Sequence, residues 1–216
     1  MRRLKLAVLI SGRGSNLQAL IDAAAAPDYP AEIALVIANR PDAQGLARAT
    51  AAGLATRVID HTAFPDRAAF DAALDAALRA QAIELVCLAG FMRLLTDGFV
   101  TAWQDRMINI HPSLLPAFKG LHTHARAPAA GVRVAGCTVH FVRPQMDEGP
   151  IIVQAAVPVL PDDTADALAA RVLAAEHRCY PAAVRWIAEG RLRVVERRVV
   201  IDGAVAAAAP LLNPPP

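Results

Sequence analysis

The first half of the chain alternates short, wholly apolar runs with segments of helical periodicity. The apolar runs lie at residues 6–10, 33–38 and 85–89, and the strongest helical spacing of leucine and alanine fills residues 15–26 and 66–82. A strand that is apolar at every position has to be covered on both faces, which is typical of parallel sheets flanked by helices. We therefore predict an α/β protein with a Rossmann-like, mostly parallel sheet and helices on both faces.

The second half of the chain follows a different pattern. A short strand over 107–110 runs into a proline-rich loop, residues 137–142 alternate polar and apolar side chains, and 151–159 form another extended run. The longest helical pattern follows at 163–187, and residues 191–201 indicate terminal strands. Alternation is typical of strands with one exposed face, so we expect antiparallel additions to the sheet in this half.

Charge and cysteine content argue against several classes of protein. The 216 residues are 55% hydrophobic and 19% charged with a formal net charge of +2, so charge gives no reason to expect a nucleic-acid or membrane-surface partner. No apolar run approaches the ~20 residues of a transmembrane helix. The three cysteines, Cys87, Cys137 and Cys179, are scattered and odd in number, which indicates reduced thiols in a cytoplasmic protein.

A glycine loop with the sequence SGRGSN, residues 11–16, joins the first predicted strand to the first helix. Glycines let backbone N–H groups approach an anion, and the start of a helix adds the positive end of its dipole. We expect Ser15 and Asn16 to cap this helix. Leu17 replaces the third glycine of a dinucleotide motif, and Asn39, not an acid, follows the second strand. The loop therefore predicts a mononucleotide phosphate site; the alternative is a turn without a ligand.

A second motif, NIHPSLLP, begins at Asn109. Asn109 and His111 are two residues apart on an extended segment, so their side chains point to the same side. An amide beside an imidazole can bind a developing oxyanion and manage a proton. Pro112 and Pro116 stiffen the turn that follows. Such a pair at the end of a strand is structural more often than catalytic when it stands alone.

The third motif, QMDEGP at residues 145–150, is a tight loop that can present the carboxylate of Asp147. The alternative is a solvated acid in a turn. His122 and His124 are close in sequence, but no cysteine or carboxylate set completes a zinc pattern around them. We therefore predict no metal site.

Together these motifs resemble the phosphoribosylglycinamide formyltransferase family. The resemblance rests on LISGRGSNLQALIDA, on AGFMRLL at 89–95, on INIHPSLLPAFKGLHTHARA at 108–127 and on GCTVHFV with MDEGPIIVQ within 136–154. Their order and spacing match over roughly residues 4–195, which is nearly the whole chain.

The resemblance implies an enzyme that transfers the formyl group of 10-formyltetrahydrofolate, its co-substrate, to the amine of glycinamide ribonucleotide. The products would be formylglycinamide ribonucleotide and tetrahydrofolate, in de novo purine (IMP) biosynthesis. The catalytic roles carry over to Asn109, His111 and Asp147. Asn109 and a protonated His111 would bind the oxyanion of a tetrahedral intermediate. Asp147 would pair with His111 and help to move a proton from the attacking amine to the leaving folate nitrogen.

The resemblance also implies where the two substrates bind. The ribonucleotide is expected at Gly14, Ser15, Asn16, Pro112 and Glu176. The folate is expected at Phe91, Met92, Arg93, Leu95, Val142 and Met146, and His140 would support the catalytic residues. We predict one domain over residues 1–203, with a phosphate-binding half at about 1–105 and a catalytic, folate-binding half at about 106–203. The Ala/Pro-rich tail at 204–216 is expected to be a mobile appendage.

Two related enzymes and one non-enzyme are the alternatives. Formyltetrahydrofolate hydrolase and methionyl-tRNA formyltransferase share this core, but they add an N-terminal regulatory domain or a C-terminal tRNA domain for which we see no room. A non-catalytic nucleotide-binding domain of the same fold is disfavoured by the intact catalytic residues. We expect small-molecule partners only and a monomer or homodimer. The loops at 119–123 and 143–149 are the predicted mobile lids.

Overall fold

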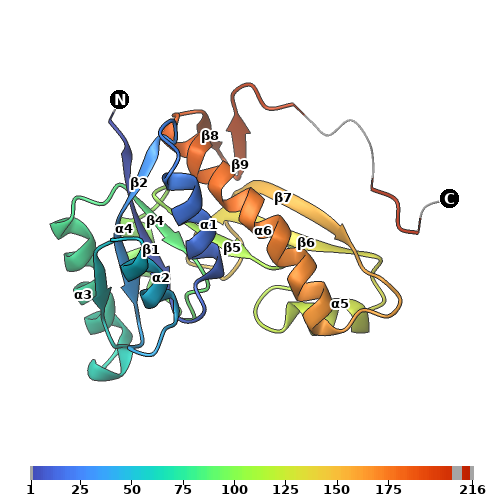
Figure 1. Cartoon of the computed structure of the whole chain (residues 1–216), viewed down its shortest axis with the longest axis horizontal. Coiled ribbons are helices and arrows are strands. Elements are labelled where there is room, and N and C mark those ends of the chain that lie inside the picture. The colour runs from blue at the N-terminus through green and yellow to red at the C-terminus, as the bar shows by residue number, and fades with distance from the viewer. Residues whose placement is uncertain (1, 206–210, 215–216) are drawn as a thin grey trace. The chain divides into compact units, whose positions relative to one another are not determined.

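The computed structural model describes residues 2–205 and 211–214 and confirms the α/β fold. Seven strands form a mostly parallel sheet in the order β3-β2-β1-β4-β5-β6-β7, and β8 and β9 form a separate pair (Figure 1). The chain divides into two compact units, residues 1–109 with 141–144 and residues 110–140 with 145–216. The prediction of a single domain over 1–203 stays a prediction.

The first unit contains parallel strands and the helices that cover them. Each neighbouring pair, from β3 through β2, β1 and β4 to β5, runs parallel, as the apolar runs predict. In chain order its elements are β1 (Leu4–Ile10), α1 (Ser15–Ala24), β2 (Ala31–Ala38), α2 (Gly45–Ala51), β3 (Thr56–Val58), the 3₁₀ helix η1 (His61–Ala63), α3 (Arg67–Ala80), β4 (Leu85–Leu88), α4 (Asp97–Ala102) and β5 (Met107–His111), the last of which continues into the second unit.

Both faces of these parallel strands are buried, which explains why residues 6–10 of β1 are all apolar. Ala7 and Leu9 belong to a cluster with the inner residues of α3 and α4, such as Leu74 and Phe99. On the opposite face, Ile10 approaches α2 so closely that a Cβ built on Gly45 would lie 2.6 Å from its Cδ1. Figure 1 shows α1 on one side of these strands and α3 on the other. Helices therefore cover both faces, as predicted.

The second unit is antiparallel in its strands. Its elements are α5 (Thr123–Ala129), β6 (Val134–Phe141, whose last residue belongs to the first unit), β7 (Ile151–Pro158), α6 (Ala165–Ala188), β8 (Leu192–Val195) and β9 (Arg198–Ile201). β6 pairs with β7, and β8 pairs with β9, both antiparallel. A Cβ on Gly136 would lie 1.9 Å from the carbonyl oxygen of Ala155, so β6 and β7 approach each other here at a distance that only glycine allows.

Helix α1 begins differently from the sequence expectation. Its N-cap is Gly14, in the left-handed region at φ 71°, and no described side chain caps the helix. Ser15 and Asn16 are its first helical residues, so the expectation that they would cap it was wrong. The chain enters the helix through a sharp left-handed turn that glycine adopts without Cβ strain, and glycine has no side chain to offer as a cap.

Two short elements, α4 and η1, were not predicted. The prediction of a mobile tail can be followed only in part, because residues 206–210 and 215–216 lie outside the described residues, as does Met1. In the described part, the side chain of Asn213 donates a hydrogen bond to the carbonyl of Val159 at 2.9 Å. Within residues 2–205 and 211–214, no helix is both long enough and apolar enough to cross a membrane.

Candidate active site

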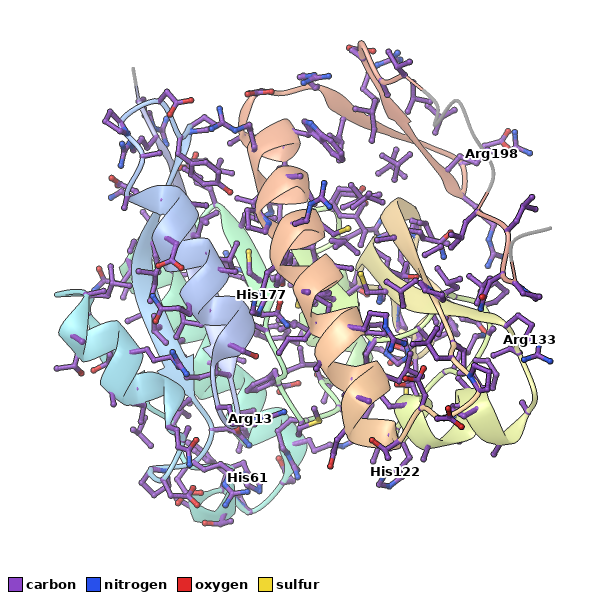
Figure 2. The ribbon with its side chains drawn as sticks, turned by 45° about the vertical axis from the view of Figure 1, so that its right-hand side comes forward. Arg13, His61, His122, Arg133, His177 and Arg198 are labelled. Carbon is purple, nitrogen blue, oxygen red and sulfur yellow. The ribbon has the colours of Figure 1, made fainter. Side chains whose placement is uncertain are left out.

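The glycine loop of the first unit is packed tightly against the start of α2. The N–H of Gly45 donates to the carbonyl of Gly12 at 2.9 Å, and a Cβ on Gly14 would lie 2.6 Å from the Cα of Gly45. Arg13 lies beside the N-terminal end of α1 (Figure 2), and its carbonyl accepts from Arg48 at 3.0 Å. Gly45 was not singled out from the sequence, because only the tertiary contact gives it this role. The loop has a fixed shape at the N-terminus of a helix, which is a favourable place for an anion.

The segment at 91–95, expected to bind folate, also lies in the first unit. Phe91 stacks on Phe70 with ring centroids 6.5 Å apart, and Phe91, Leu95 and Val142 are half-buried against one apolar cluster. Met92, by contrast, exposes 63% of its surface. The structure therefore brings three of the expected folate residues to one cluster and presents a fourth to solvent.

Arg93 is half-buried in this segment and has one fully buried polar atom. Its Nε is buried and has no hydrogen-bond partner among the described residues. A buried guanidinium nitrogen without a partner is costly. It is therefore a candidate for binding a polar group of a ligand.

His111 lies at the end of β5 and is 6% exposed, whereas Asn109, two positions earlier on the same strand, is half-buried. The Nε2 atom of His111 is 3.0 Å from the carbonyl oxygen of Phe118. A carbonyl oxygen can only accept, so Nε2 carries its hydrogen and donates. The other ring nitrogen, Nδ1, is left to face Asp147.

Asp147 occupies a buried, preformed position in the second unit. Its backbone is in the left-handed region at φ 57°, and its carboxylate is only 10% exposed. Oδ2 lies 3.5 Å from Nδ1 of His111 and accepts from the N–H of Gly120 at 2.9 Å, and Oδ1 lies 4.0 Å from Nε2 of His140. Asp147 is therefore not a solvated acid in a turn. The structure brings it together with the two histidines that the sequence singled out.

A buried polar network fixes the loop that follows His111. The hydroxyl of Thr138, fully buried on β6, donates to the carbonyl of Ser113 at 2.7 Å and accepts from the N–H of Leu115 at 3.0 Å. Gln154 on β7 donates to Thr138 at 3.0 Å and to the carbonyl of Leu115 at 2.9 Å. The sequence pointed to the prolines as the rigid elements of this loop. Thr138 and Gln154 were missed, because their role depends on the pairing of β6 with β7.

The two predicted lids contact each other within the second unit. Lys119 and Glu148 form an ion pair at 2.6 Å, next to the hydrogen bond between Gly120 and Asp147. Met146, expected at the folate, is 53% exposed and lies close to Gly120. A movement of one loop therefore has to break contacts with the other.

Two further residues expected at the ribonucleotide, Glu176 and Pro112, also belong to the second unit. Glu176 is 6% exposed on α6. Pro112 lines a small cavity of about 130 Å³, together with His124 and Thr123. Burial lowers the pKa of His124, and the nearby His111 lowers it further. His122 is the exposed residue that precedes α5 (Figure 2).

Possible metal ligands and the three cysteines are the remaining reactive groups to consider in the described part of the chain. No group of three or more His, Cys, Asp or Glu residues among those described could hold a metal ion. All three cysteines are free and buried. A hydrogen bond with Cys179 and burial raise the pKa of Cys137, so that thiol stays protonated.

Comparison with known proteins identifies relatives along most of the chain. Residues 4–184 match the family described as formyl transferase. The chain is 45% identical to phosphoribosylglycinamide formyltransferase of Escherichia coli (strain K12), over 93% of this chain and 94% of that protein. It is 51% identical to the trifunctional purine biosynthetic protein adenosine-3 of Gallus gallus over 90% of this chain, but it spans only 19% of that relative. The structure is similar to glycinamide ribonucleotide transformylase 1 from Symbiobacterium toebii, with a TM-score of 0.90, 54% identity and coverage of 92% of this chain and 94% of that one.

Proposed function

The chain belongs to the formyl transferase family, and on that premise we propose that it is a phosphoribosylglycinamide formyltransferase. It transfers the formyl group of 10-formyltetrahydrofolate to the amine of glycinamide ribonucleotide, a step of de novo purine biosynthesis. The observation that carries this proposal is the buried contact between His111 and Asp147, 3.5 Å apart, in a chain 45% identical to an enzyme of that name over nearly its whole length. The other activities of the trifunctional relatives are not part of the proposal.

The proposed reaction needs no covalent enzyme intermediate. The lone pair of the substrate amine forms a C–N bond to the formyl carbon, and the carbonyl π electrons move to oxygen. The oxyanion is stabilised by the Asn109 amide and the His111 imidazolium. The amine then loses a proton, the oxyanion re-forms the carbonyl, and the bond from carbon to folate N10 breaks. N10 takes up a proton, and Asp147 with its histidine partner conducts the proton between the two nitrogens, through water.

The hydrogen bond of His111 to Phe118 suggests how the resting site is held. The Nε2–H group donates to a backbone carbonyl at 3.0 Å, while Nδ1 faces Asp147. We propose that the oxygen of the formyl group replaces the Phe118 carbonyl as the acceptor of this hydrogen bond. The loop that holds Phe118 then has to move when substrates bind, which agrees with the expectation of a lid at 119–123. The Asp147 contact keeps the ring in its orientation during this exchange.

The proposed substrate contacts are those that the family resemblance implies. The phosphate of the ribonucleotide binds at Gly14, Ser15 and Asn16, where a fixed loop meets the start of a helix. Its remaining contacts are proposed at Pro112 and Glu176. The folate binds along Phe91, Met92, Arg93, Leu95, Val142 and Met146, with the buried Nε of Arg93 toward its polar part. His140, 4.0 Å from Asp147, supports the charge of the site.

The proposal requires only small-molecule partners and no metal. Three free, buried cysteines support the cytoplasmic setting that the sequence predicts. The fold places no requirement on assembly, so a monomer or a homodimer is compatible with the proposed reaction.

The experiment that tests the proposal is an absorbance assay of purified protein with 10-formyltetrahydrofolate, with and without glycinamide ribonucleotide. We expect deformylated folate to form only when the ribonucleotide is present. Formation without any acceptor would identify the hydrolase instead. Binding of folate without turnover under either condition would identify a non-catalytic domain.

A further inference from the structure

Ser11 lies at the point where the order of the parallel strands in the first unit reverses. β1 has β2 on one side and β4 on the other, although β2 follows it directly in the chain and β4 comes later. Ligands of open α/β sheets bind at the carboxyl ends of the strands at such a switch point. Ser11 is the first residue after β1 and is 8% exposed. It therefore lies beneath a ligand-binding edge, not on its surface.

The hydroxyl of Ser11 joins two segments that are far apart in sequence. It accepts from the N–H of Met92 at 2.7 Å, and because that N–H can only donate, the hydroxyl hydrogen is free for its other partner. It donates this hydrogen to Oδ1 of Asn39 at 2.6 Å. The backbone N–H of Ser11 also donates to the carbonyl of Gly90 at 3.2 Å. One residue thus connects the ends of β1, β2 and β4.

Asn39 completes the connection and has no surface left for a ligand. It is 2% exposed, and its Nδ2 lies 3.2 Å from Nδ1 of His61, the first residue of η1 (Figure 2). Dinucleotide-binding folds use an acid near the end of this strand to bind a ribose. Here the side chain is buried under the loop and engaged by Ser11. The side chain of Asn39 therefore holds the loops in place and does not bind a ribose.

We propose that Ser11 is a positioning residue that fixes the anion-binding loop at 12–16 relative to the folate-binding segment at 91–95. The inference rests on the proposed function of those two segments. Ser11 touches neither substrate. It sets the distance between the two segments that do, and Asn39 sets the orientation of its hydroxyl. Loss of the Ser11 hydroxyl therefore weakens the binding of both ligands.

The test is Ser11→Ala in the full chain, at a temperature where all variants are fully folded. Binding of inorganic phosphate and of 5-formyltetrahydrofolate is measured separately by calorimetry. We expect both Kd values to rise about tenfold, which corresponds to one net hydrogen bond, and kcat/KM to fall by a similar factor for both substrates. Asn39→Ala keeps the bond to Met92 and should raise both Kd values less, by about threefold.

Thr164→Ala is the matched control, because it removes another structural hydroxyl, the cap of α6 that accepts from Ala167 at 3.1 Å. It should lower stability without changing either Kd. A Ser11→Ala protein that binds either probe as tightly as the wild type overturns the positioning role. A wild-type chain that binds neither probe refutes the proposed function of the two segments instead, so the two failures are distinguishable.

Discussion

The replacement Asp147→Asn separates the charge of the proposed catalytic carboxylate from its size. Asparagine tolerates the left-handed backbone at φ 57°, and its amide oxygen can still accept from the N–H of Gly120, so the fold should be unchanged. The lost interaction is that between a carboxylate and an imidazolium 3.5 Å apart. At an effective dielectric constant of about 20, that pair interacts by at most about 5 kcal/mol.

Part of that interaction is already present before the reaction, so only the part that grows in the transition state affects the rate. Removal of one such group typically lowers kcat by about 10²–10³-fold, or roughly 2.7–4 kcal/mol, which is within the Coulomb limit. We expect a loss of that size for Asp147→Asn in the absorbance assay, with KM nearly unchanged and an unchanged melting temperature.

The neighbouring acid provides the control. Glu148 pairs with Lys119 at the surface, where its side chain is 40% exposed. An exposed ion pair contributes about 0–1 kcal/mol, so Glu148→Gln should keep kcat within about threefold of the wild type. An Asp147→Asn enzyme that also stays within about threefold, or two variants that lose activity equally, would contradict a catalytic role for the Asp147 charge.

Two further predictions concern the glycine loop and the stability of the chain at acid pH. Gly14→Ala should lower the free energy of unfolding by about 2 kcal/mol or more and abolish phosphate binding, because φ is positive and the new Cβ would lie 2.6 Å from the Cα of Gly45. A Cβ added by Gly12→Ala meets nothing within 4 Å, so this variant should change the free energy of unfolding by less than about 0.5 kcal/mol. Chemical denaturation of both variants checks this, and equal losses would contradict it. Hydrogen bonds from Arg171 lower the pKa of Asp163 from 3.8 to about 2 in the folded chain, so its contribution to stability is complete above pH 3.8 and disappears as the pH falls toward 2. Asp163→Asn should therefore lower Tm at pH 7, and a difference from wild type that did not shrink between pH 4 and pH 2 would show that this linkage is absent.

The parallel part of the fold could be predicted because each of its strands is a local signal. Residues 6–10 of β1, 33–38 of β2 and 85–88 of β4 are continuous apolar runs, as burial on both faces of a sheet requires. The short helix α4 gave no such signal, since six residues are too few for a helical period to stand out. Its start depends on Thr96, whose hydroxyl accepts from Phe99 while donating to Asp71 across the unit.

The candidate site was predictable only in part, because only some of its residues are brought together by a local sequence pattern. Asn109 and His111 are brought together by the period of a strand, which the sequence shows directly. Asp147 lies 36 residues beyond His111, and no local pattern brings them together; the resemblance to a family did so. The roles of Thr138 and Ser11 depend on hydrogen bonds between segments that are distant in sequence. The sequence around a serine or threonine does not show which distant group its hydroxyl will bind.

Formyl transfer from folate to the ribonucleotide can be measured directly by following the formyl carbon. The donor is 10-formyltetrahydrofolate labelled with ¹³C in the formyl group, and the products formed with glycinamide ribonucleotide are analysed by mass spectrometry. We expect the label to appear in formylglycinamide ribonucleotide in step with tetrahydrofolate, and about 10²–10³-fold more slowly with Asp147→Asn. Label that appears only as free formate, or label transferred equally fast by the variant, would contradict it.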